Sequence, residues 1–103
     1  MNQQLELENK VVLAAVQALF GAVTPSMAAI TVQVDGDREE AILHVALKHE
    51  DATIGSLLEE IADDVNQYSE DAVAVTVRTW VGDDWTTDWP GLDFRKLYAE
   101  LRR

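Results

Sequence analysis

Two runs of alternating apolar and polar residues, separated by a turn signal, constrain the fold of this chain more than any other feature. They lie in the stretch ITVQVDGDREEAILHVALKH, at residues 30–34 and 43–47. Alternation with a period of two is typical of β-strands, because successive side chains point to opposite faces of a sheet. Asp35-Gly36 is a strong hairpin signal, and residues 38–40 can lengthen the loop. The sequence therefore predicts an antiparallel hairpin.

Helical periodicity precedes the hairpin. A first helix is predicted over about residues 5–22, and Gly21 and Pro25 lie where it would lose regularity and stop. The apolar residues that it is predicted to bury, at i, i+3 and i+4 spacing, are Val12, Ala15, Val16, Leu19 and Val23. Leu13 and Phe20 are expected to widen this buried stripe.

A second helix is predicted after the hairpin, over about residues 53–68, with Thr53 or Asp51 as its cap. The apolar residues on one side of this helix are Ile54, Leu57, Leu58, Ile61, Val65 and Tyr68. The opposite side holds Glu59, Glu60, Asp63 and Asp64, so this helix is expected to show water a face of carboxylates.

The C-terminal third predicts one strand and one ambiguous element. Val73, Val75 and Val77 alternate with polar or small residues as a third strand. Residues 94–101 carry apolar side chains at helical spacing, which favours a helix slightly, although a short fourth strand is the alternative. The predicted fold is one α+β domain over residues 1–103: helix, β-hairpin, helix, strand and a terminal element, with an antiparallel sheet and helices on one face.

Length and composition fit a small intracellular domain. At 103 residues and 48% hydrophobic content the chain can build one modest core. The absence of cysteine fits a reducing compartment. The N-terminus lacks the pattern of a signal peptide, and no apolar run is long enough to span a membrane. We therefore expect a soluble, cytoplasmic protein.

The negative charge is concentrated in one continuous segment. The formal net charge is −11, and residues 50–93 hold twelve acidic residues and one basic residue, Arg78, which also sums to −11. An anionic surface repels nucleic acid and anionic lipid and attracts cationic partners. We therefore expect no nucleic-acid or membrane partner. Solubility alone is the simpler explanation of the charge.

Three tryptophans and three aspartates lie in WVGDDWTTDW, at residues 80–89. Trp80 is expected to pack at the end of the sheet. Trp85 and Trp89 are flanked by turn or acidic residues and are predicted to be hard to bury. They either cap the small core from a long loop or anchor a partner, since tryptophan is common at interface hot spots.

No pattern in the chain indicates catalysis, a metal site or a cofactor. His44 and His49 do not have the spacing of metal ligands, and no glycine-rich phosphate loop is present. The carboxylates are predicted on an exposed helix face and in loops, whereas a general acid–base pair must converge on a cleft. We therefore predict a protein that is not an enzyme and uses no metal and no cofactor.

Residues 9 to about 78 combine an amphipathic opening helix, a G-x-V-x-P turn at Gly21, Val23 and Pro25, a hairpin, and an acidic EEIADD helix. In these features the chain resembles a bacterial family of small acidic proteins from polymorphic-toxin systems. Such proteins resemble immunity proteins of contact-dependent growth-inhibition loci, which neutralise the product of an adjacent toxin gene by binding it. The resemblance implies a strand over residues 96–101. The segment DDWTTDWPGLD departs from the family pattern.

These features together predict a toxin-neutralising immunity protein that binds a cognate, basic, nuclease-like toxin through an acidic surface. The predicted contact residues are Glu59, Glu60, Asp63, Asp64, Asp83, Asp84, Trp85, Asp88 and Trp89. Charge complementarity speeds association, and a central aromatic anchor supplies tight binding. The alternative is a non-catalytic acidic oligomeric or housekeeping interaction domain, and the oligomeric state is left open.

Overall fold

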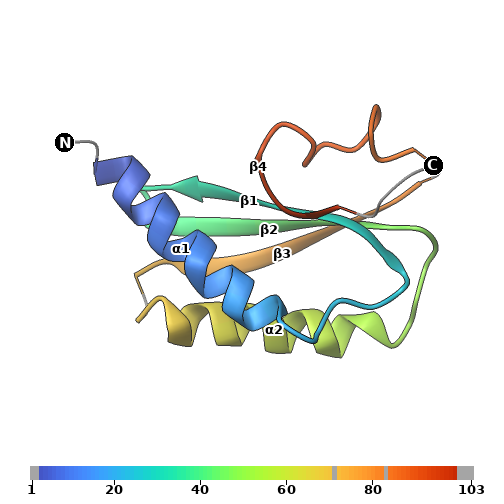
Figure 1. Cartoon of the computed structure of the whole chain (residues 1–103), viewed down its shortest axis with the longest axis horizontal. Helices are drawn as coiled ribbons and strands as arrows, with labels where there is room; N and C mark the ends of the chain where they lie inside the picture. The colour runs from blue at the N-terminus through green and yellow to red at the C-terminus, as the bar shows by residue number, and fades with distance from the viewer. Residues whose placement is uncertain (1–2, 71, 83, 100–103) are drawn as a thin grey trace.

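A computed structural model of the chain describes residues 3–70, 72–82 and 84–99 (Figure 1). Its elements, in chain order, are α1 (Gln3–Leu19), β1 (Met27–Asp35), β2 (Glu40–Leu47), α2 (Ile54–Tyr68), β3 (Ala74–Val81) and β4 (Arg95–Ala99). The four strands form one sheet in the order β3-β2-β1-β4. The α+β architecture and the element order predicted from the sequence are confirmed.

The sheet is mixed, so the prediction of a purely antiparallel sheet is wrong. Strand β1 is antiparallel to both β2 and β4, but β3 runs parallel to β2. The cause is the connection: α2 carries the chain back along the sheet, so the strand that follows starts at the same end as β2. Residues 30–34 and 43–47 do form the predicted hairpin strands.

The terminal element is a strand, and the slight preference for a helix over residues 94–101 is wrong. Residues 95–99 pair with the free edge of β1, where Ile30 lies opposite Tyr98 and Val32 opposite Arg95. Pairing with β1 satisfies the backbone of both strands, and this tertiary gain outweighs a weak local helical pattern. Leu101, part of that pattern, lies outside the described residues.

Both helices cover one face of the sheet, where the main core lies (Figure 1). Strand residues of this face, such as Ile30, Val32, Leu43 and Val45, pack against α1 and α2. From α1 the core takes Val11, Ala14, Ala15, Ala18 and Leu19. The prediction that Leu13, Val16 and Phe20 are buried is wrong, because α1 turns Leu13 and Val16 towards solvent and Phe20, just beyond its end, is exposed too.

The first helix also ends earlier than predicted. It stops at Leu19, and Gly21 follows with a φ of 77°. That backbone conformation suits glycine and is typical of the residue just beyond a helix end. The amide of Ala22 donates to the carbonyl of Leu19 at 2.9 Å, which closes the last turn.

The opposite face of the sheet is covered by residues 84–94, which we call the tryptophan segment. Trp85 and Trp89 pack there against Ala28, Ala29 and Ala46, forming a second, smaller core. Ala29 alternates with Ile30 of the main core, and Ala46 with Val45 and Leu47, as the pleat of a sheet requires. Ala28 joins Ala29 in the second core where the register of β1 shifts, between Met27 and Ala29. The molecule therefore has three layers: helices, sheet and tryptophan segment.

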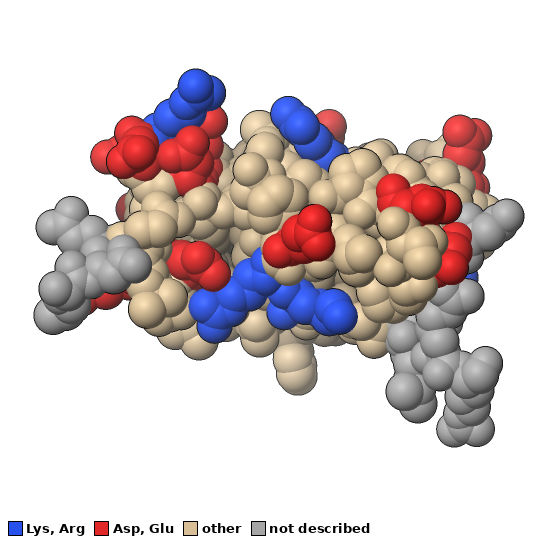
Figure 2. All heavy atoms as spheres, turned by 90° about the horizontal axis from the view of Figure 1, so that it is seen from above, with Lys and Arg blue, Asp and Glu red and all other residues tan. Residues whose placement is uncertain are grey.

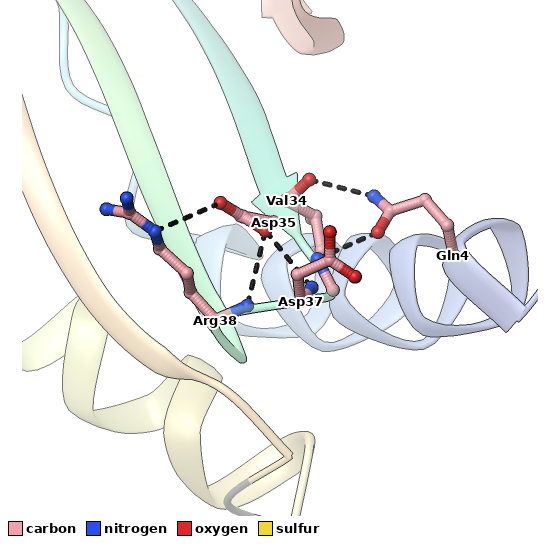
Figure 3. A network of polar contacts seen from close by, with 6 residues as sticks. Gln4, Val34, Asp35, Asp37 and Arg38 are labelled. Atoms are coloured by element: carbon pink, nitrogen blue, oxygen red, sulfur yellow. Dashed lines mark hydrogen bonds and ion pairs between the residues drawn. The ribbon is translucent and has the colours of Figure 1, made fainter.

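A polar network fixes the hairpin turn to the start of α1 (Figure 3). The side-chain amide of Gln4 donates to the carbonyl of Val34 at 2.8 Å and accepts from the backbone N–H of Gly36 at 2.8 Å. Asp35 accepts from the backbone amides of Asp37 and Arg38 at 3.1 and 3.3 Å. The predicted turn therefore also positions the first helix against the sheet.

Neither helix in the described part of the chain is both long enough and apolar enough to cross a membrane.

Candidate partner-binding surface

The outer side of α2 carries the predicted carboxylates. Glu59, Glu60 and Asp63 are exposed and Asp64 is half-exposed, while the opposite side of the helix packs into the main core. No Lys, Arg or His occurs within α2. Among the residues that the structure describes, none of the four carboxylates forms an ion pair. This part of the surface therefore presents uncompensated negative charge.

The spacing of these carboxylates weakens the helix that carries them. Glu59 and Asp63, and likewise Glu60 and Asp64, are four residues apart and therefore neighbours on the helix surface. Like charges at this spacing destabilise a helix by about 0.2–0.5 kcal/mol per pair. The arrangement is unfavourable for α2 itself, and a cationic partner would relieve it.

The prediction that Trp85 and Trp89 are hard to bury is wrong. Trp85 is only 8% exposed and Trp89 only 3% exposed. The two rings meet edge to face with their centroids 6.3 Å apart, and the ammonium of Lys96 lies 5.5 Å from the centroid of the Trp85 ring. The small side chains of Ala29 and Ala46 leave room on the sheet for both indoles. This geometry matches the alternative in which the two tryptophans cap the core from a long loop. Neither ring presents a face to a partner.

A buried hydrogen bond also holds the tryptophan segment. The hydroxyl of Thr31, fully buried on β1, donates to the carbonyl of Gly91 at 2.6 Å. Gly91 itself approaches closely, because a Cβ atom at this position would lie 2.5 Å from the Cβ of His44. Glycine is therefore required for the segment to lie this close to the sheet.

The aspartates of the tryptophan segment differ in their environments. Asp84 is half-exposed and accepts hydrogen bonds from the backbone amide of Thr86, at 3.0 Å, and from the Thr86 hydroxyl. Asp88 is exposed. Asp83 lies outside the described residues. Asp84 therefore has a local role in the turn, and Asp88 is the more accessible of the two.

The structure does not bring the predicted contact residues together on one surface. The carboxylates of α2 belong to the helical layer, whereas the tryptophan segment lies on the other side of the sheet. In Figure 1 the chain leading to β4 lies on the upper side of the molecule. Figure 2 views this side from above and shows Lys and Arg side chains among Asp and Glu. Basic and acidic side chains are therefore mixed on that side, whereas α2 itself carries no basic residue.

A feature that sequence reasoning missed lies next to α2. Leu13, Val16 and Phe20 are 67%, 49% and 91% exposed, and Tyr68 at the end of α2 is 51% exposed. We call these four side chains the apolar stripe. Val16, Phe20 and Tyr68, with Gln17, line a shallow hollow of 320 Å³. The spacing of Leu13, Val16 and Phe20 was visible in the sequence, but only the packing of α1 shows which of its sides faces water.

A larger hollow of 620 Å³ lies between the start of α2 and the ends of β2 and β3. Asp51 at its rim has a lowered pKa, because the hydroxyl and backbone amide of Thr53 and the hydroxyl of Ser26 donate to its carboxylate. These bonds occupy the carboxylate in shaping the turn before α2. They favour its ionised form, which is opposite to the raised pKa that a general acid needs.

His44 is built into the tryptophan side of the sheet. Its ring stacks on Phe94 at a centroid distance of 4.9 Å, and its Nε2 lies 3.0 Å from Oε1 of Gln33. Burial lowers the pKa of His44, and the charge of Arg78 lowers it further. Within residues 3–70, 72–82 and 84–99, no group of three or more His, Cys, Asp or Glu side chains could hold a metal ion.

Comparison with protein-family models gave no match, and comparison with curated proteins gave none either.

Proposed function

We propose that this protein neutralises a basic protein toxin by binding it, as immunity proteins of contact-dependent growth-inhibition systems do. The observation that carries the proposal is the outer side of α2, where four carboxylates lie without counter-charge among the described residues. An acidic surface of this kind complements the basic substrate cleft of a nuclease and accelerates encounter with it.

The proposed binding surface does not include the two tryptophans that the sequence suggested as anchors. Both indoles of the tryptophan segment are buried against the sheet, so the binding surface is assigned to α2 and not to residues 84–94. Trp85 and Trp89 then support the fold, and the partner meets the helical layer.

The test is binding to the protein encoded beside the gene for this chain, with association and dissociation rates measured at two ionic strengths. We expect the variant Glu59→Gln, Glu60→Gln, Asp63→Asn and Asp64→Asn to associate more slowly and with weaker salt dependence. A matched control removes four exposed carboxylates elsewhere: Asp37→Asn, Glu40→Gln, Glu50→Gln and Asp93→Asn.

Both variants change the net charge equally, so a larger effect of the α2 variant identifies the surface rather than the total charge. If the two variants slow association equally, the α2 face has no special role. If the wild-type protein neither binds the neighbouring product nor protects cells from it, the proposed function is wrong.

A further inference from the structure

Helix α1 buries three alanines together with Val11 and Leu19, but other large apolar side chains on it or at its end stay exposed. Ala14, Ala15 and Ala18 lie in the core, whereas Leu13 on the same helix and Phe20 just beyond its end are mostly exposed. A lone protein gains more by burying the larger side chains, because the gain grows with the apolar area removed from water. Exposed apolar side chains that gather on one side of a helix are typical of a surface that contacts a partner.

The apolar stripe is continuous across the two helices. Leu13 and Val16 are three residues apart and lie on one side of α1. Phe20 follows just beyond the helix end and lines the same hollow as Val16. Tyr68 reaches the same hollow from α2. Anchors at this spacing are the arrangement by which helical surfaces recognise apolar side chains of a partner.

Carboxylates border the stripe on the α2 side. Asp64 and Glu60 lie four and eight residues before Tyr68, and therefore on the same side of the helix as its ring. Lys10 is the one basic residue of α1, and it forms an ion pair with Glu70, with 4.0 Å between Nζ and Oε2. The surface thus combines an apolar centre with an acidic margin.

We propose that the apolar stripe is the anchor site for the basic partner, and that it receives an amphipathic segment with apolar side chains flanked by Lys or Arg. This inference rests on the proposed function and adds to it the position of the buried contact. The apolar side chains fill the hollow between Phe20 and Tyr68, while the flanking cations meet Glu60 and Asp64. Charge pairs of this kind set the register, and the desolvated apolar centre slows dissociation.

A second copy of this chain fits the same surface less well. Each copy carries a net charge of −11. Pairing two copies through the stripe brings their α2 carboxylates towards each other, and like charges across an interface are costly. The charge next to the stripe therefore selects a cationic partner.

The test uses the full chain and a probe of defined chemistry: an amphipathic helical peptide with leucine on one face and lysine on the other. Backbone amide NMR spectra are recorded during a titration. We expect the shifts to map to the apolar stripe and its acidic margin. Phe20→Ser should weaken the affinity about tenfold or more. A control, Val81→Ser, removes an exposed apolar side chain from β3 and should leave the affinity unchanged.

The outcomes separate this inference from the proposed function. Shifts that map elsewhere, an affinity unchanged by Phe20→Ser, or equal binding of a peptide with glutamate in place of lysine overturn the anchor site. A dimer in sedimentation experiments that is lost in Phe20→Ser overturns it too, because the occupant is then a second copy. If the anchor fails while the neighbouring gene product still binds with salt-dependent association, the proposed function stands without it. If the peptide binds at the stripe and that product does not bind, only the proposed function fails.

Discussion

Replacing Trp89 by alanine should cost this protein much of its stability, although the sequence predicts a residue that is hard to bury. The ring is 3% exposed and packs against the alanines of β1 and β2 and against Trp85. A buried aromatic side chain removes about 150–250 Å² from water, which at about 25 cal/mol per Å² amounts to roughly 4–6 kcal/mol as an upper bound. Large-to-small substitutions of buried tryptophan measured in other proteins cost about 3–5 kcal/mol.

The neighbours of Trp89 make a loss of stability of about 3–5 kcal/mol the expected result. Ala29 and Ala46 have no side chain long enough to fill the space, so the cavity closes only if the tryptophan segment moves. A domain of this length has a total stability of about 5–15 kcal/mol, so the variant should be only marginally folded. Phe20→Ala is the matched control, because it removes an aromatic ring that is 91% exposed and should change stability by no more than about 0.5 kcal/mol.

Urea unfolding followed by far-UV circular dichroism measures both variants, and it avoids tryptophan fluorescence, which the substitution itself alters. We expect Trp89→Ala to lower the unfolding midpoint strongly and Phe20→Ala to leave it nearly unchanged. A loss below about 1 kcal/mol for Trp89→Ala, or an equal loss for the two variants, would refute the assignment of Trp89 to the core.

Three further perturbations test other parts of the structure. Thr31→Val removes the buried hydroxyl that holds the tryptophan segment and should cost about 1 kcal/mol in urea unfolding, whereas Thr76→Val on the exposed part of β3 should cost little. Ile61→Asp places an unpaired charge under α2 and should abolish the cooperative thermal transition. Glu60→Gln should keep stability within about 0.5 kcal/mol. A large loss of stability in Glu60→Gln would contradict an open acidic face. Since burial lowers the pKa of His44, the unfolded chain binds a proton more readily, so stability should fall as the pH drops below about 6.5. His44→Gln should flatten that dependence between pH 7 and 5, and an unchanged pH profile would show that the residue does not carry it.

The elements that local periodicity encodes were predictable from the chain alone. Alternation at residues 30–34 and 43–47 identified β1 and β2, and the stripe from Ile54 to Val65 identified α2 almost to the residue. The exposed carboxylates of α2 followed from the same periodicity, because a helix that buries one side must turn the other to water. Side-chain direction relative to the backbone is a local property, so a single segment is enough to reveal it.

Only the tertiary structure decided which apolar side chains are buried and how the strands pair. Hydropathy ranks Phe20 and Trp89 alike as residues that gain from burial, yet one is exposed and the other enclosed. The difference comes from residues far away in sequence: Ala29 and Ala46 leave room for indoles on one face of the sheet, and the packing of α1 turns Phe20 outwards. The parallel pairing of β3 and the conversion of residues 95–99 into a strand have the same origin, since a free β1 edge and a returning helix exist only after the rest of the chain has folded. A side chain is buried by contact with residues from other segments of the chain, so no single stretch of sequence determines its burial.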